Sequence, residues 1–347
     1  MPSEGRPVRL KDVADHAGVS LATASRMLSD ADYKGRAALR DRVLAAAAEL
    51  GYRPNLHARA LASSTSTSVG LVVHDVRDSY FAMIAGGVIE VAEAHDLLVT
   101  MVCTYRDPRQ ELNYLRLLST QRPRAIVLAG SSFSDRAHAA AMMEQLAAYQ
   151  AAGGAIVSVT RGRKIGHLVK IGNVEAARRL AHRLVDLGHT SFGVISGPAK
   201  LTSVSDRLRG FRLGLEDRGV RLAPGSIVRV DLSRDGGARG ARLLLDRPDR
   251  PDRPTCVFGV ADVVAVGAMA WIRSAGLRVP ADVSVAGFGG TPLAFDTVPV
   301  LTTVELPLER IGRVAMELAL LPGNEPRHTV EIDGAVQMRD STAPPRP

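Results

Sequence analysis

The stretch LKDVADHAGVSLATASRML at residues 10–28 has the layout of two short helices joined by a tight turn. Its apolar residues recur at helical spacing over residues 11–17, and Gly18 then supplies the positive φ that a tight turn needs. Ser20 stands where a helix N-cap belongs, just before the second helix at residues 21–29. In DNA-binding proteins with this layout the second helix lies in the major groove, although a two-helix surface corner without nucleic acid has the same pattern.

Two more helices are expected downstream, over residues 37–50 and 56–62, with Gly51 closing the first of them. A Ser/Thr run then occupies residues 63–68 and is typical of a solvated linker. The predicted organisation is a headpiece over residues 8–62, a linker at 63–68 and a large domain over 69–345.

The large domain alternates short apolar runs with amphipathic helical stretches, which is the pattern of parallel sheets covered on both faces. It holds too many strands for one open sheet, so we expect two similar α/β lobes with a ligand site between them, at the carboxyl ends of strands. Strands are predicted at residues 69–73, 98–103, 125–129, 156–159, 192–195, 227–230, 256–260 and 283–287. Helices are predicted at residues 81–95, 109–120, 174–187, 206–218 and 263–275.

The composition of the 347-residue chain, 46% hydrophobic and 23% charged, is ordinary for a globular protein of two or three folding units. No apolar run approaches the roughly 18 residues of a membrane span, and the first ten residues do not form a secretory signal, so a cytoplasmic protein is expected. Cys103 and Cys256 lie far apart in strand-like runs, which favours reduced core residues over a disulfide, a nucleophile or a metal site. The net charge of +8 permits a polyanionic partner, and residues 1–62 carry ten Lys and Arg against seven Asp and Glu.

An enzyme is the chief alternative for an α/β fold, but two common catalytic signatures are missing. The sequence contains neither a phosphate-binding Gly-rich loop ending in Lys-Ser/Thr nor a Gly-x-Ser-x-Gly nucleophile elbow. The pairs Gly86-Gly87 and Gly236-Gly237 are isolated and are interpreted as turn and packing features. The nine histidines are scattered without metal-binding spacing, so we expect no metal site. Together with the missing signatures, this leads us to expect no catalytic residue and no cofactor. A two-lobed transport protein is a second alternative, but it should lack the headpiece.

Several short motifs follow one another in the order of a known family. They are the helix–turn–helix stretch itself, ELGYRPN at 49–55, LGH at 187–189, ISGP at 195–198, VPADVSVAGF at 279–288, LTTV at 301–304 and STAPP at 341–345. Together they resemble the LacI/GalR (lactose-repressor) family of transcriptional regulators, collinearly over nearly all of residues 8–345. The resemblance implies an α/β protein with an N-terminal all-α helix–turn–helix headpiece and a two-lobed sensor domain like that of periplasmic binding proteins, with parallel sheets.

In the headpiece, the resemblance implies that Leu21, Ala22 and Arg26 face base edges in the major groove. An arginine there can reach O6 and N7 of guanine with two hydrogen bonds, so Arg26 is the best candidate for reading sequence. Thr23 and Ser25 are expected to contact phosphates or to pack, which positions the protein without specifying a sequence.

The resemblance also implies a hinge helix that forms on operator binding, with Asn55 as its cap. Leu61 then occupies the position of the apolar wedge that enters the minor groove and kinks the DNA, while an exposed or packed leucine is the alternative. Arg36 replaces the usual capping Ser before the third helix, a change that weakens the cap by about 1 kcal/mol and adds a phosphate-seeking charge. The predicted DNA-binding set is completed by Leu10, Ser20, His57 and Arg59.

The sensor domain matches the family at three pocket positions. Arg207 matches the ligand-binding arginine of the second lobe, and Tyr80 and Ser131 fall at positions of the first lobe. A surface ion pair with Asp206 or Glu216 is the alternative role for Arg207.

Other polar groups of the family pocket are missing. Thr160 and Gly172 replace frequent acidic residues, Gly289 and its neighbour replace an Asp-Asp pair, and Leu232 sits where a stacking aromatic is usual. Because acidic and aromatic groups recognise sugars, we expect an effector that is not an ordinary neutral sugar: it is anionic, or less polar than a sugar, or the pocket is unused. The predicted effector-binding residues are Tyr80, Ser131, Thr160, Arg207, Leu232, Asp262 and Gly289.

The function implied by the resemblance is that of a repressor that binds a palindromic operator as a homodimer. A small molecule in the interlobe cleft would modulate operator affinity through its differential affinity for two conformations. The sequence leaves open whether the ligand releases DNA or promotes binding.

Overall fold

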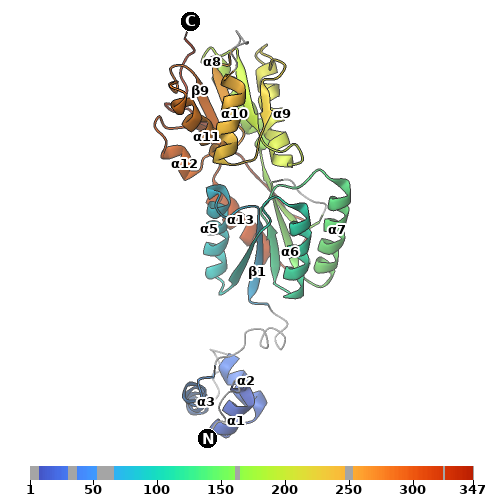
Figure 1. Cartoon of the computed structure of the whole chain (residues 1–347). Helices are drawn as coiled ribbons and strands as arrows, with labels where there is room; N and C mark the ends of the chain where they lie inside the picture. The colour runs from blue at the N-terminus through green and yellow to red at the C-terminus, as the bar shows by residue number, and fades with distance from the viewer. Residues whose placement is uncertain are drawn as a thin grey trace. The chain divides into compact units, whose positions relative to one another are not determined.

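The computed structural model describes residues 8–29, 37–52, 66–160, 165–246, 253–322 and 325–346. By its internal contacts the chain divides into two compact units, Met1–Thr67 and Ser68–Pro347 (Figure 1). The first unit holds the helix–turn–helix stretch, and the second holds two mostly parallel sheets with their helices. The predicted fold class is therefore confirmed.

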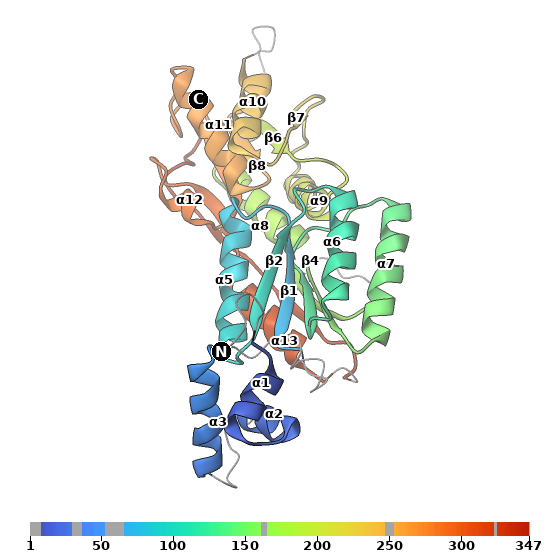
Figure 2. The ribbon, with the colours of Figure 1, turned by 60° about the horizontal axis from the view of Figure 1, so that its bottom comes forward.

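The headpiece contains three helices, α1 (Leu10–Ala17), α2 (Leu21–Ser29) and α3 (Ala37–Glu49), each within one residue of its predicted bounds. Gly18 ends α1 with a φ of 63°, as the turn requires. The helices pack against one another (Figure 2) around a core that is rich in alanine. This core consists of Val13, Ala14, Ala17, Ala24, Met27, Val43, Ala46 and Ala47.

The first lobe of the second unit is a six-stranded parallel sheet in the order β11-β5-β4-β3-β1-β2. Alternate strand residues enter two separate cores, so both faces of the sheet are covered. α5 and α13 cover one face, and α6 and α7 cover the other. The strands are β1 (Ser68–Val73), β2 (Leu98–Cys103), β3 (Ala125–Leu128), β4 (Ala155–Thr160), β5 (His167–Ile171) and β11 (Thr329–Ile332). The helices are α5 (Ser79–Glu93), α6 (Pro108–Thr120), α7 (Arg136–Ala151) and α13 (Leu308–Leu320).

The second lobe repeats the architecture in the order β12-β10-β9-β8-β6-β7, with only β12 antiparallel to its neighbour. α8 packs on α9, and α10 packs on α11. The strands are β6 (Phe192–Ser196), β7 (Ile227–Arg229), β8 (Cys256–Gly259), β9 (Ser284–Gly289), β10 (Thr302–Glu305) and β12 (Ala335–Gln337). The helices are α8 (Asn173–Asp186), α9 (Thr202–Glu216), α10 (Arg234–Leu245), α11 (Asp262–Ser274) and α12 (Pro292–Phe295).

The chain crosses between the lobes three times: from β5 to α8, from β10 to α13, and from β11 to β12. Each lobe is therefore completed by segments that return from the other. All eight predicted strands are present, and the sequence analysis missed β5, β10, β11 and β12.

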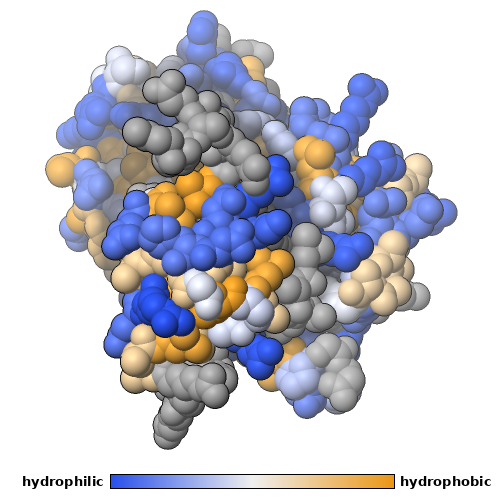
Figure 3. Space-filling model, turned by 90° about the horizontal axis from the view of Figure 1, so that it is seen from below, coloured by the Kyte–Doolittle hydropathy of each residue, from blue (hydrophilic) through white to orange (hydrophobic). Residues whose placement is uncertain are grey.

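Among the described residues, no helix has the length and apolarity needed to cross a membrane. On the face drawn in Figure 3, hydrophobic side chains lie in small groups among hydrophilic ones. Cys103 and Cys256 are both free thiols, and Cys256 is buried in the core of the second lobe.

The glycine pairs lie inside helices, so their interpretation as turns was wrong, whereas packing explains two of them. A Cβ atom on Gly87 of α5 would lie 2.0 Å from the Glu309 carbonyl oxygen of α13, and one on Gly237 of α10 would lie 2.1 Å from the Val264 carbonyl oxygen of α11. These glycines allow backbone-to-backbone helix packing.

We predict that Gly87→Ala destabilises the second unit by about 1–3 kcal/mol, because the added methyl group has no room against α13. Gly86→Ala is the matched control on the same helix, where a Cβ meets nothing within 4 Å. The control should gain up to about 1 kcal/mol from the higher helix propensity of alanine. Denaturant unfolding of the two variants measures both effects, and destabilisation of equal size would contradict the packing argument.

Candidate functional site

The second helix of the headpiece begins at a side-chain cap. The Ser20 hydroxyl accepts a hydrogen bond from the Thr23 backbone N–H at 3.1 Å, and the two side-chain hydroxyls lie 2.7 Å apart. This satisfies one of the amides left free at the start of a helix. Ser20 is thus a cap by its contacts, and the Thr23 hydroxyl is already engaged with it.

The packing of α2 decides which of its side chains remain available. Ala24 and Met27 are buried in the headpiece core. Leu21, Ala22 and Arg26 are exposed, with Leu21 51% accessible to solvent. The helix therefore presents the three side chains that the sequence analysis assigned to base contacts.

The remaining predicted DNA-binding residues differ in their surroundings. Thr23 and Ser25 are half-buried on α2. Leu10 packs partly buried against the headpiece core, so its side chain is directed to the interior. The predicted contacts of the third-helix cap and the hinge lie outside the described residues: these are Arg36, Asn55, His57, Arg59 and Leu61.

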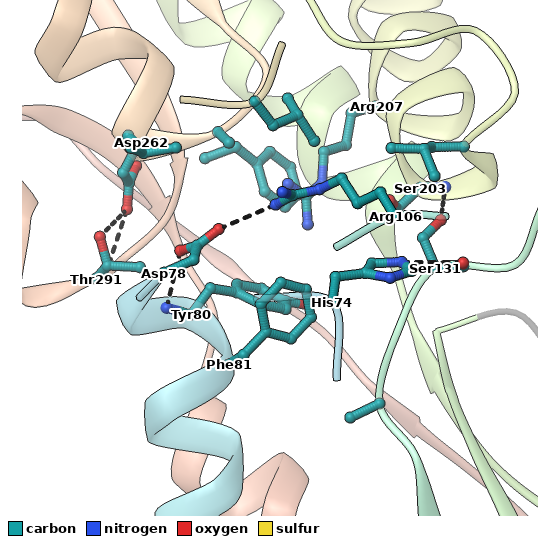
Figure 4. A pocket seen from close by; sticks show the side chains of 16 residues that line it. His74, Asp78, Tyr80, Phe81, Arg106, Ser131, Ser203, Arg207, Asp262 and Thr291 are labelled. Atoms are coloured by element: carbon teal, nitrogen blue, oxygen red, sulfur yellow. Dashed lines mark hydrogen bonds and ion pairs between the residues drawn. The ribbon is translucent and has the colours of Figure 1, made fainter. Parts of the chain in front are cut away.

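In the second unit, a cavity of about 50 Å³ lies between the lobes. Its lining includes residues that directly follow β1, β3 and β8, so it sits at the carboxyl ends of strands. Five of the predicted effector residues line it (Figure 4): Tyr80, Ser131, Arg207, Leu232 and Asp262. Gly289 is not part of the lining, although its neighbour Phe288 is, and the side chain of Thr160 lies outside what the structure describes.

Arg207 is buried inside the second lobe, so the alternative of a surface ion pair was wrong. Its Nε donates to the Asn173 amide oxygen at 2.8 Å, and its Nη1 donates to the Val260 carbonyl at 2.9 Å. The guanidinium carbon stacks 4.1 Å above the centre of the Phe288 ring. Burial lowers the pKa of Arg207 from its ordinary value. Its acceptors are neutral.

Asp262 lines the cavity, but its oxygens are already engaged. One oxygen accepts from the Thr303 hydroxyl at 2.5 Å, and the other accepts from the Thr291 amide at 2.8 Å and the Thr291 hydroxyl at 3.1 Å. Burial raises the pKa of this carboxyl above its usual range. Asp262 therefore fastens the start of α11 to the segment after β9 and to β10.

The two glycines that replace the family's acidic pair have a local reason. A Cβ on Gly289 would lie 3.0 Å from the Asp262 carboxylate, which approaches it closely. Gly290 has a φ of +69°, and a Cβ there would lie 2.6 Å from the Glu305 backbone. The backbone therefore favours glycine at both positions.

The sequence analysis missed three polar residues of the first lobe that line the cavity: His74, Asp78 and Arg106. They lie in the loops that follow β1 and β2. A search for polar residues just after the predicted strands could have found them, because ligand sites lie at the carboxyl ends of parallel strands. The Asp78 carboxylate caps α5 by accepting from the Tyr80 amide at 3.1 Å, and its other oxygen lies 3.4 Å from Arg106 Nη2. Two aspartates and the rings of Tyr80, Phe81 and Phe288 line this cavity, so it keeps acidic and aromatic groups although Leu232 and Gly289 stand where the family usually has others.

His74 is a buried, neutral member of this wall. Its Nδ1 lies 2.9 Å from the Thr104 hydroxyl and its Nε2 lies 3.2 Å from the Ser131 carbonyl. Burial, with help from the charge of Arg106, lowers the pKa of His74 to about 4. At neutral pH its Nε2–H donates to the carbonyl, and Nδ1 accepts from the hydroxyl.

Ser131 belongs to a set of hydrogen bonds that joins the lobes. Its hydroxyl accepts from the Ser203 amide at 3.0 Å. Two backbone bonds continue the contact, from Thr202 N–H to the Ser132 carbonyl at 3.1 Å and from Ser134 N–H to the Lys200 carbonyl at 2.9 Å. We call the pairing of residues 131–134 with 200–203 the interlobe clasp. It closes one side of the cavity.

A helix–turn–helix headpiece joined in one chain to a two-lobed α/β body defines a DNA-binding transcriptional regulator with a sensor domain. The sequence of residues 9–55 matches the family model for bacterial regulatory proteins of the lacI family. Residues 181–342 match the family model for periplasmic binding protein-like domains. The HTH-type transcriptional regulator GalS of Salmonella typhimurium is 31% identical over 90% of this chain and 89% of its own length. For the HTH-type transcriptional repressor CytR of Escherichia coli K12 the identity is 32%, over 90% and 88%. The chain belongs to the LacI family of transcriptional regulators.

The fold is shared with a solved structure of the lac repressor dimer bound to operator and the anti-inducer ONPF. The TM-score is 0.82 at 24% identity, over 97% of this chain and 100% of that chain. The likeness extends through both units of the chain.

We predict that Ser20→Ala lowers the stability of α2 by about 1 kcal/mol, because one amide at the helix start loses its acceptor. Hydrogen exchange of the α2 amides in the full chain measures the loss. Ser25→Ala on the same helix is the control and should change exchange little, since Ser25 does not stand at the cap. Equal effects of the two changes would count against the cap.

A second prediction concerns acid stability. Between pH 6.5 and about 4, unfolded His74 binds a proton that folded His74 does not, so the free energy of unfolding falls as the pH is lowered. The contribution is about 1.4 kcal/mol per pH unit at its steepest. His74→Gln should give a shallower slope in denaturant titrations across this range, and identical slopes in the two proteins would contradict a buried neutral histidine.

Proposed function

We propose that this LacI-family regulator is a repressor that binds a palindromic operator as a homodimer. Its operator affinity depends on a small molecule bound in the interlobe cavity. The observation that carries the proposal is the exposed face of α2, where a capped helix held by buried Ala24 and Met27 offers Leu21, Ala22 and Arg26. In this proposal, the regulator represses transcription by occupying its operator.

Each side chain of α2 has a proposed role at the DNA. Arg26 donates two hydrogen bonds to a guanine edge, while Leu21 and Ala22 make apolar contacts with base edges. Ser25 and the Ser20–Thr23 cap lie toward phosphates, which sets the position of the helix without reading sequence.

The hinge completes the proposed interface. Asn55 caps a helix that forms on the operator, Leu61 wedges into the minor groove, and Arg36, His57 and Arg59 contact the DNA backbone. These assignments rest on the motif, since the five residues lie outside the described part of the chain.

A homodimer follows from a twofold-symmetric operator, whose half-sites need two headpieces about one helical turn apart. The second lobe offers an apolar surface that suits a second copy. Val298 is 87% exposed and Phe295 is 50% exposed, beside a hollow of about 490 Å³ that Val266, Met269 and Leu293 help to line. Exposed apolar surface of this kind is typical of protein–protein contacts.

The effector that fits the cavity best is anionic. Arg207 is a buried cation whose hydrogen bonds go to neutral acceptors, and the carboxylates of Asp262 and Asp78 attract it without forming an ion pair with it in the described part of the chain. A buried charge is costly unless an opposite charge compensates it closely. An anionic ligand supplies that charge. Its effect on operator affinity is limited to the difference between its affinities for the two sensor conformations.

Arg26→Ala tests the DNA-binding proposal. We expect a loss of roughly 1–3 kcal/mol for the best site selected from random duplexes, together with relaxed preference at one base pair. Arg42→Ala is the matched control, an exposed arginine on α3, and it should lower affinity equally for all sequences or not at all. Wild-type protein without preference for any duplex at moderate salt would overturn the proposal.

A further inference from the structure

We propose that Arg106 and Arg207 together form an oxyanion site, and that the effector carries a phosphate or carboxylate group which takes Arg106 from Asp78. This inference rests on the proposed function of the interlobe cavity and deepens it. The two arginines come from opposite lobes: Arg106 follows β2 of the first lobe, and Arg207 lies on α9 of the second. Figure 4 shows both side chains reaching into the cavity.

The backbone that carries Arg106 is held in an unusual conformation. Tyr105 and Arg106 both have positive φ angles, 49° and 62°, in the left-handed region that residues other than glycine rarely occupy. Backbone hydrogen bonds tie this turn to the end of β1: the Thr104 amide donates to Val73 O at 2.9 Å, and the Tyr105 amide donates to His74 O at 2.7 Å. Strain of this kind persists where the surroundings impose it and gathers at ligand sites.

Arg106 uses little of its hydrogen-bonding capacity. Its contact with Asp78 is 3.4 Å long, whereas charge-assisted hydrogen bonds are usually about 2.7–2.9 Å. Its Nε is buried and has no acceptor among the described residues. The guanidinium has five N–H donors, so an acceptor-rich group beside it would be bound strongly.

The acidic residues of the cavity leave Arg207 without a contacting carboxylate. Asp262 is occupied by Thr291 and Thr303, and Asp78 by the α5 cap and Arg106. The cavity thus offers spare donors from two guanidinium groups, while its two carboxylates are already engaged. A phosphate or carboxylate has the complementary character, since it only accepts hydrogen bonds and brings negative charge.

The size of the cavity points the same way. A volume of about 50 Å³ is smaller than the roughly 300–1,000 Å³ of sites for larger ligands, so the present walls admit only a compact group. Withdrawal of Arg106 from Asp78 would open more room. An oxyanion held by both arginines links the two lobes, and it therefore favours the conformation in which they are closed.

Isothermal titration calorimetry of the full chain with inorganic phosphate and with malonate tests the site, against chloride at matched ionic strength. We expect wild-type protein to bind at least one of the two probes, and which of them binds tells phosphate from carboxylate recognition. Arg106→Gln should weaken that binding roughly 10- to 100-fold, as expected for loss of a charge-assisted hydrogen bond. Arg77→Gln is the matched control, because Arg77 is exposed and pairs with Asp75, and it should bind like wild type.

Asp78→Asn gives a second and opposite readout. It removes the competing charge while an amide oxygen can still cap α5, so it should tighten binding of the same probe. If Asp78 and Arg106 had merely structural roles, substitutions at the two positions would not change the affinity for the probe in opposite directions.

The proposal is overturned if neither probe binds better than chloride to wild type and Asp78→Asn, or if Arg106→Gln binds as wild type does. Operator selection with the same variants keeps this result separate from the proposed function. Arg106→Gln should retain the sequence preference of wild type. If the wild-type protein selected no DNA sequence over any other, the DNA-binding proposal would be overturned instead.

Discussion

The guanidinium of Arg207 fixes the wall of the second lobe around which the interlobe cavity is built. It joins Asn173 at the start of α8, Val260 after β8 and the ring of Phe288 on β9. The chain enters the second lobe through Asn173, so the arginine fastens a lobe crossing to two central strands. A buried cation whose hydrogen-bond acceptors are neutral is costly, and this cost is the support for the proposed negative ligand.

Most of the fold could be predicted because its central strands are buried on both faces and read as continuous apolar runs. β1 and β8 are of this kind. Two of the missed strands lack that signal: β11 lies at a sheet edge with exposed Thr329 and Glu331, and β12 has only three residues. α7 was missed because the alanine-rich stretch at 136–151 has no clear apolar face.

The candidate site divides in the same way. Tyr80, Ser131 and Arg207 were found because they match pocket positions of the family that the sequence resembles. Arg106 and His74 were not, because their place in the cavity depends on a left-handed turn and on a buried hydrogen-bond pair, which sequence periodicity does not register. Judging the pocket by its family positions alone also overlooked Asp78, which enters the wall from a helix cap.

In the proposed mechanism, the interlobe cavity and the interlobe clasp act on the same equilibrium between open and closed lobes. The hydrogen bonds of the interlobe clasp, from residues 131–134 to 200–203, form only when the lobes are near each other, so opening the cleft breaks them. Hydrogen bonds contribute about 0.5–1.5 kcal/mol each, so the few bonds of the clasp favour the closed lobes by a free energy that ligand binding can match or exceed. A ligand gripped from both lobes adds to the clasp in the closed form and contributes nothing of the kind in the open one. In the proposed mechanism, its differential affinity for the closed form comes from bridging the lobes rather than from tight binding alone, and that difference sets its effect on operator affinity.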